Sequence, residues 1–310
     1  MTSFNHVSNI GQRDAFASLE DNLKSFLDWS FLNIGGFVNV SIPVNPTNPG
    51  YHQLIPLSGD PSLAYGKEWG TLRKDWVYET GINYENTSPS PISGIIVNGT
   101  FLPAPTGSGN YGYYIDHTNG RIIFDKNISV SSKVYLNYSY RLLQVYKSSE
   151  NFWWKEIEAN NYNPSTVLFK TPNYTANSIQ LPAIVIQTAS RSQLIPYELG
   201  TTENILRQDV LLHVFSELSS QRNNFIDILL KQKDNSFYLY DINKVIKNQS
   251  QPLNFRGEAN PSRLNYDQIV NDTELMLKKA FIFNSTLSEI QSFTNSLHHG
   301  VVRWTIEIFP

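Results

Sequence analysis

The sequence contains no cysteine, few charged residues and no long apolar run. The absence of cysteine excludes disulfides, thiolate catalysis and zinc sites with cysteine ligands. The chain has 24 basic and 27 acidic residues and a formal net charge of −3, which argues against a dedicated nucleic-acid-binding protein. No stretch reaches the roughly 18 consecutive apolar residues of a membrane-spanning helix. Residues 1–13 lack the basic and apolar regions of a signal peptide, so we expect assembly in a reducing cytoplasm.

The polarity of the sequence comes mainly from neutral side chains, and aromatic residues are frequent. Only 16% of the residues are charged, whereas the sequence contains 32 Asn, 17 Tyr and 17 Phe. Asn favours turns over helix interiors, and large aromatic residues favour strands. A chain of 310 residues can form one large domain or two of ordinary size, and it can bury a core without covalent cross-links. The composition therefore predicts a β-rich protein with long connections.

The N-terminal part combines one helix with one strand. Apolar residues spaced three and four apart predict the helix, and they are Phe16, Leu19, Leu23, Phe26, Leu27 and Phe31. Gly35-Gly36 is expected to end this helix, and the alternating residues 37–42 predict a strand. Residues 45–60 are rich in Pro, Asn and Gly, which predicts a long surface loop.

Residues 90–146 carry the clearest strand pattern. Short apolar or alternating runs predict four strands, at residues 92–97, 111–116, 121–124 and 133–140. Asn98-Gly99 and Asn119-Gly120 mark turns, because Asn and Gly tolerate positive φ. This region predicts an antiparallel meander or a small sandwich.

The C-terminal part predicts a second β-rich core. Its expected strands are residues 182–186, 205–215, 236–240, 279–283 and 302–309, with a helix around 225–230. Residues 244–271 are polar and interrupted by prolines, which predicts a long polar arm.

These elements together predict a β-rich α+β fold. In this fold the N-terminal helix packs on a C-terminal mixed or antiparallel sheet to form a discontinuous core, with an antiparallel β domain inserted. We expect residues 1–60 to contribute the N-terminal helix and strand of the core domain, and residues 61–150 to form the inserted domain. Residues 151–310 then complete the core and carry the polar arm near 244–271.

No motif predicts a catalytic, cofactor-binding or metal-binding site. His298 and His299 are neighbours on a strand and point to opposite faces, so they cannot readily share one metal. Asp116 and Asp125 flank a hairpin, but the acidic spacing of a calcium-binding EF-hand is missing. The sequence also lacks the Gly-x-Ser-x-Gly and phosphate-loop patterns. We therefore expect no enzyme and no cofactor. One alternative is a hydrolase using Glu156 or Glu158, since glycoside hydrolysis needs two carboxylates flanking a cleft.

Aromatic residues offer a binding hypothesis. Trp69, Trp76 and the tyrosines of 111–114 can either anchor a partner or pack in the core. Tyr113 and Tyr114 lie on opposite faces of a strand, so one of them should be exposed. The residues that we predict at an interface are Trp153, Trp154, Tyr113, Tyr114, Arg191 and Arg207.

Two regions resemble phage proteins. Val97-Asn98-Gly99, residues 113–124 and residues 134–140 look like β domains of structural proteins in tailed-bacteriophage virions. Residues 184–187, 194–215 and 225–230, with the strand that follows, resemble neck or tail-terminator proteins of contractile-tailed phages. The resemblance covers residues 90–310, and it is carried by turn residues and apolar alternation.

The resemblance implies a virion structural protein without catalysis. Such proteins form homo-oligomeric rings at the head–tail junction, as neck, tail-terminator or tail-completion proteins, and join the tail to the head connector. The implied partners are copies of the chain itself, neck or portal-adaptor proteins, and tail tube or sheath proteins. Genomic DNA passes the lumen without sequence-specific binding, and no membrane is involved. The alternative is a carbohydrate-binding adhesin or baseplate-associated module that uses Trp153, Trp154 and the tyrosine-rich strands.

Overall fold

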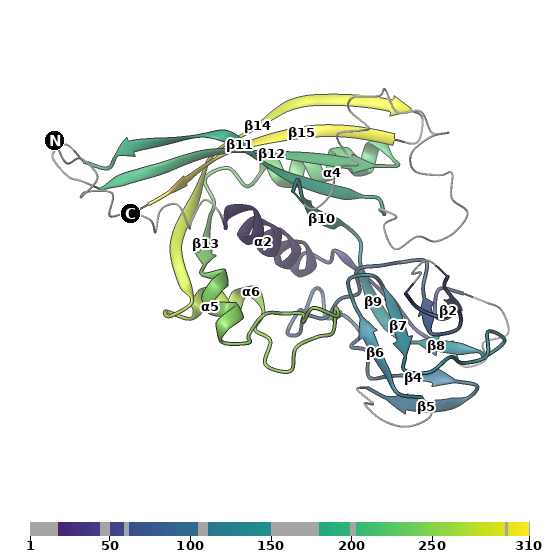
Figure 1. Cartoon of the computed structure of the whole chain (residues 1–310). Helices are drawn as coiled ribbons and strands as arrows, with labels where there is room; N and C mark the ends of the chain where they lie inside the picture. Colours follow the sequence, from purple (N-terminus) through teal and green to yellow (C-terminus); the bar gives the residue numbers. More distant parts are fainter. Residues whose placement is uncertain are drawn as a thin grey trace.

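The protein combines two main β-sheets: a six-stranded sheet that contains the longest strands, called the larger sheet here, and a seven-stranded sheet of short strands. Helices cover one face of the larger sheet (Figure 1). The computed structural model describes residues 18–43, 50–58, 62–104, 111–149, 180–198, 203–294 and 297–309. The N-terminal helix contacts the C-terminal mixed sheet, and an antiparallel sheet is inserted between them in the sequence. This confirms the β-rich α+β fold that the sequence predicts.

The larger sheet has six strands in the order β10-β11-β12-β15-β14-β13. β10 runs parallel to β11, and the other neighbouring strands are antiparallel. The strands are β10 (Gln144–Lys147), β11 (Ala183–Pro196), β12 (Asn204–Ser216), β13 (Ser236–Tyr240), β14 (Met276–Thr294) and β15 (Leu297–Ile308). The strands expected at 205–215, 236–240 and 302–309 are confirmed, whereas β14 is far longer than the expected 279–283.

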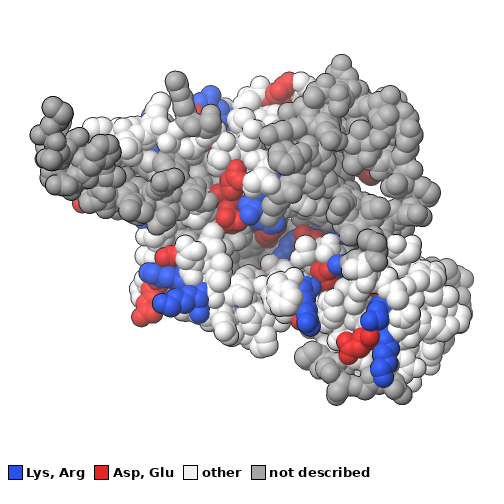
Figure 2. Space-filling model, in the orientation of Figure 1, with Lys and Arg blue, Asp and Glu red and all other residues white. Residues whose placement is uncertain are grey.

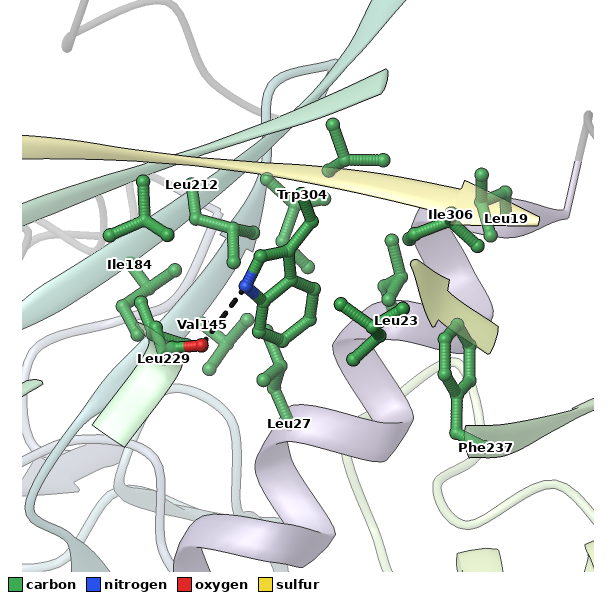
Figure 3. Packing of buried hydrophobic residues seen from close by; sticks show 14 of the residues in the cluster. Leu19, Leu23, Leu27, Val145, Ile184, Leu212, Leu229, Phe237, Trp304 and Ile306 are labelled. Atoms are coloured by element: carbon green, nitrogen blue, oxygen red, sulfur yellow. Dashed lines mark hydrogen bonds between the residues drawn. The ribbon is translucent and has the colours of Figure 1, made fainter. Parts of the chain in front are cut away.

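Helix α2 (Leu19–Asn33) covers one face of this sheet and confirms the predicted N-terminal helix. Its buried residues Leu19, Leu23 and Leu27 point toward Trp304 and Ile306 of β15 (Figure 3). The two-residue period of a strand brings Trp304 and Ile306 to the same face, and the helical period aligns the three leucines. The discontinuous core therefore joins the two ends of the chain.

Helix α4 (Ser219–Leu230) packs on the same face of the sheet. Phe225, Ile226 and Leu229 belong to the same buried cluster as the leucines of α2, and Phe31 meets Phe225 edge to face at 5.8 Å between ring centroids. Both helices thus share one apolar layer with the inner face of the sheet. No helix within the described ranges is both long and apolar enough to span a membrane.

The inserted sheet has seven strands in the order β5-β4-β8-β2-β3-β7-β6, and all its neighbouring pairs are antiparallel. The strands are β2 (Gln53–Pro56), β3 (Glu68–Gly70), β4 (Gly94–Val97), β5 (Thr100–Pro103), β6 (Tyr113–Asp116), β7 (Arg121–Phe124) and β8 (Val134–Leu136). Asn98 and Gly99 join β4 to β5 with φ values of 50° and 85°, as a two-residue hairpin turn requires. A separate pair is formed by β1 (Phe37–Val40) and β9 (Tyr138–Arg141).

Two short strands lie near the expected domain boundaries, and their pairing shows which sheet each of them belongs to. β2 lies at residues 53–56, within the segment that the sequence predicts as a loop, and it pairs with β3 and β8 of the inserted sheet. β10 ends at Lys147 and pairs with β11 of the larger sheet. The boundaries at residues 60 and 150 stay predictions.

The segment expected as a polar arm is folded against the rest of the chain. Helices α5 (Ile242–Lys247) and α6 (Tyr266–Asn271) enclose a small apolar cluster of Tyr240, Val245, Ile269, Val270 and Leu275. Arg263 donates a hydrogen bond from Nε to the carbonyl oxygen of Tyr78 (3.2 Å), and the backbone N–H of His117 donates to Gly257 (2.9 Å). The expectation of a long arm at 244–271 was wrong, because scattered apolar residues and backbone hydrogen bonds fix this segment.

Arg141 of β9 joins α2 to the inserted region. Its side chain is 3% exposed and forms an ion pair with Glu79. The Nε atom lies 3.8 Å from Asp28 Oδ1 of α2, and Nη1 lies 3.7 Å from Asp75 Oδ1. The guanidinium also lies over the ring of Tyr78, at 5.0 Å from its centroid. One cation therefore balances three carboxylates, one from α2 and two from residues 75–79.

Stability should depend on the protonation of Asp28. Burial raises its pKa from 3.8 to about 7, opposed by Arg141 and Lys24 and reinforced by Asp75 and Glu79. The folded state therefore holds a proton that the unfolded state has lost, so this group reduces stability as pH rises from about 4 to 7. We expect the free energy of unfolding of Asp28→Asn, relative to the original chain, to rise over that interval in urea titrations. Parallel pH curves for the two proteins would contradict this.

Candidate assembly interface

The β14–β15 hairpin leaves one long strand edge open. β13 pairs with β14 from Met276 to Phe281, and the last backbone hydrogen bonds on this side join Ile282 to residues 234 and 235. Within the described ranges, no strand pairs with the outer edge of β14 beyond Ile282. Residues 286–292 are all exposed, with Leu287 at 44% and Ile290 at 49%. This part of β14 therefore offers backbone donors and acceptors next to apolar side chains.

The β11–β12 hairpin leaves a second edge open on the opposite side of the same sheet. β10 pairs with β11 at residues 183–186, and Glu20 of α2 accepts a hydrogen bond from the backbone N–H of Thr188 (3.2 Å). Beyond Thr188, no other strand in the described part of the chain lies against the outer edge of β11. Leu194 is 59% exposed on this edge strand. Figure 1 shows the two hairpins reaching toward opposite sides of the molecule.

Open edges of this length are unusual on a protein that works alone. An unpaired strand edge is a template for another chain, and natural proteins usually block it with lysine, proline, bulges or a covering segment. Residues 283–294 of β14 contain a single charged residue, Glu289, and no proline, although the pairing of β14 with β15 has register shifts. Residues 189–196 of β11 contain one charged residue, Arg191, and end at Pro196, and the pairing of β11 with β12 shifts between Thr188 and Ser192. We therefore identify the outer edges of β14 and β11 as the candidate site of assembly.

The outer face of the larger sheet carries a polar network between these edges. Arg207 donates a hydrogen bond from Nε to Glu307 Oε1 (2.9 Å). Asp209 pairs with Arg303 and accepts a hydrogen bond from Thr305 Oγ1 (2.7 Å). Although burial acts to raise the pKa of Asp209, the hydrogen bonds from Arg303 and Thr305 lower it. The network keeps opposite charges paired across β12 and β15.

Arg207 has a place in this network that suits an interface residue. Its guanidinium lies 4.9 Å from the centroid of Phe283 on β14, and both residues line a hollow of about 350 Å³ with Gln193 of β11. Arg191 also belongs to β11, but its side chain lies outside the described residues. The interface role predicted for these two arginines stays a prediction.

The aromatic candidates divide between the core and the surface. Trp69, Trp76 and Tyr113 are buried in the core of the inserted sheet. Tyr113 also donates a hydrogen bond to the carbonyl oxygen of Leu102 (3.0 Å). Tyr114 is the partly exposed member of its pair, and Arg256 lies 5.5 Å from its ring centroid. Four predicted residues lie outside the described residues, and they are Trp153, Trp154, Glu156 and Glu158.

A cleft of about 400 Å³ opens beside Tyr114, between the inserted sheet and the segment before α6. Tyr78, Pro89 and Pro91 contribute apolar walls, and Glu258 and Arg263 contribute charged groups. Arg263 already donates to the carbonyl oxygen of Tyr78. A mixed lining of this kind can hold a small polar ligand against aromatic rings.

The histidines and carboxylates considered as ligands have other contacts. Asp116 accepts hydrogen bonds from Asn119 and from Arg121 Nε (2.8 Å), which is turn capping and ion pairing. His299 is buried and stacks on Phe215 at 4.4 Å, whereas His298 Nδ1 lies 2.9 Å from Ser292 Oγ. The described residues contain no group of three or more potential ligands that could hold a metal ion.

Charge on the visible surface is sparse and mixed. Figure 2 shows small groups of basic and acidic side chains of both signs on one face of the molecule, separated by uncharged residues. Among the described residues visible on this face, basic side chains form no broad area of the kind that tracks a nucleic-acid backbone.

The open edges were not among the predicted sites. The sequence pattern predicts a strand at 279–283 that ends there. The following residues are nevertheless weakly charged, because 281–294 contain one charged residue and the apolar residues Phe281, Phe283, Leu287 and Ile290. This long, weakly charged run beside the predicted strand could have indicated that the strand continues. Comparison with known proteins adds no relative: a scan finds no family model that matches the chain, and no curated protein matches it.

Proposed function

We propose that this chain is a structural protein of a tailed-phage virion that forms a homo-oligomeric ring at the head–tail junction. The observation that carries the proposal is the pair of open edges on the larger sheet, at β14 and β11. A subunit with unpaired edges on both sides can complete its sheet by binding further copies. The resemblance of residues 90–310 to virion, neck and tail-terminator proteins supports the location.

Within the virion, the ring would serve as a neck, tail-terminator or tail-completion protein. Its partners would be neck or portal-adaptor proteins on one side and tail tube or sheath proteins on the other. DNA would pass the lumen without sequence-specific contact, in keeping with the net charge of −3 and the mixed surface groups. The protein would assemble in the host cytoplasm and would need no cofactor or catalysis.

Detection of the chain in purified virions tests this location. The proposal expects a constant number of copies in each particle, retained after washing at high salt. Absence of the chain from particles would overturn it.

A second candidate function is carbohydrate binding, favoured by the cleft beside Tyr114. Amphipathic rings and planar polar groups such as those of Glu258 and Arg263 are suited to sugar faces and hydroxyls. A glycan array would distinguish this function, because Tyr114→Ala should remove any signal. A silent array would leave the structural role as the better account.

A further inference from the structure

We propose that neighbouring copies join head to tail, with the open edge of β14 in one copy paired to the open edge of β11 in the next. The sheets of successive copies would then form one continuous sheet around the ring. This inference rests on the proposed function because it assumes self-assembly. It adds which surfaces of neighbouring copies are in contact.

Both open edges are strand backbone, and the stretch on β14 is longer than the stretch on β11. On β14 the unpaired stretch runs from Phe283 to Thr294, and on β11 it runs from Ala189 to Pro196. Strand pairing requires extended backbone on both sides, and it satisfies the main-chain donors and acceptors of both edges.

Apolar side chains lie along both edges. Leu287 and Ile290 are exposed on β14, and Leu194 is exposed on β11. Pairing would bring such side chains within the roughly 5 Å that separates directly opposite residues on neighbouring strands. The single carboxylate of residues 283–294, at Glu289, is too little charge to block association.

A head-to-tail contact uses both edges of every copy. Pairing β14 with β14 across a two-fold axis would satisfy one edge and leave β11 open in each copy, so a dimer would keep two unpaired edges. A heterologous contact between two different surfaces repeats from copy to copy and closes into a ring when the rotation allows it. The presence of two different open edges on one sheet therefore favours the ring over the dimer.

Engineered cysteines test this pairing without background, because the chain has no cysteine. Leu287→Cys on β14 would be combined in turn with Ser192→Cys, Gln193→Cys or Leu194→Cys on β11, which samples both strand faces and neighbouring registers. Within one copy β12 and β15 lie between these strands, so three inter-strand spacings separate the positions by at least roughly 14 Å, and Leu287 is also offset along the strands, level with Ile186. A disulfide within one chain is excluded, since it needs Cα atoms within about 7 Å.

The expected result is a ladder of cross-linked oligomers on non-reducing gels after mild oxidation of at least one double variant. Each single variant should remain uncross-linked, and circular dichroism should confirm that all variants fold. Cross-linked dimers from Leu287→Cys alone would indicate two-fold pairing of β14 and overturn the inference. If the untreated chain is oligomeric by light scattering but no double variant cross-links, this pairing is wrong and the proposed function stands. A monomeric chain would contradict both.

Discussion

Replacing Trp304 with alanine should destabilise the protein by about 3–5 kcal/mol, the usual cost of deleting a fully buried large aromatic side chain. Trp304 has no exposed surface, and it lies where β15, α2 and α4 meet (Figure 3). Its Nε1 atom donates a hydrogen bond to the carbonyl oxygen of Leu229 (3.1 Å). The substitution leaves a cavity between three elements that cannot all move inward. Urea unfolding followed by far-UV circular dichroism measures the loss.

Trp304→Phe is the matched control for that prediction. Phenylalanine keeps most of the ring and removes the donor, and the carbonyl oxygen of Leu229 still accepts from Ser285 Oγ (3.2 Å) and from the backbone N–H of Gln232 (3.2 Å). We expect a loss of about 1 kcal/mol, close to that of one hydrogen bond. Equal losses for the two variants would show that cavity formation does not dominate at this position.

Replacing Arg141 with leucine should also cost about 3–5 kcal/mol, as breaking a buried ion pair usually does. Glu79, Asp28 and Asp75 would then face one another without the cation that balances them. Removal of a partner is costly because the remaining carboxylates stay buried or must take up protons. Lowering the pH to 5 should recover part of the loss, since burial raises the pKa of Asp28 and its protonation removes part of the repulsion. Urea titrations at pH 5 and pH 8 measure both effects.

Arg256→Leu is the matched control for Arg141→Leu. Arg256 is exposed and lies over the rings of Tyr114 and Phe255. We expect a change within about 0.5 kcal/mol, as for most surface substitutions. If Arg141→Leu were equally mild, the ionic cluster would not be what holds α2 to the inserted region.

The parts of the fold that the sequence predicts well are those with strong periodicity. The leucines of α2 repeat at helical spacing, and Trp304, Ile306 and Ile308 of β15 alternate as a half-buried strand should. Both patterns arise because one face of the element is buried. Residues 244–271 have no such pattern, since α5 and α6 have six residues each. Elements that short bury too few side chains to produce a readable period.

Helix-capping residues could have indicated the helices α5 and α6. Asp241 accepts hydrogen bonds from the backbone N–H groups of Asn243 and Lys244 at the start of α5. Asn265 and Gln268 form a capping box at the start of α6. Such pairs predict a helix start even where the apolar pattern is weak.

The candidate interface was harder to predict, for a different reason. Residues 286–292 of β14 are exposed on both faces, so no alternation of apolar and polar residues marks them as a strand. Whether a strand edge is open depends on which strands lie beside it, and the sheet order places β13 next to only the first part of β14. Local sequence contains no information on that arrangement.

The mass of the purified chain in solution tests self-assembly most directly. Native mass spectrometry should give one closed stoichiometry, at a whole multiple of 35.3 kDa, and electron micrographs of the same sample should show rings. The double variant Leu287→Lys/Ile290→Lys should dissociate, because charge on an edge strand opposes pairing. Phe255→Lys, at a residue that is 93% exposed and away from both edges, should leave the mass unchanged. A species of 35.3 kDa alone, at all concentrations tested, would contradict the account.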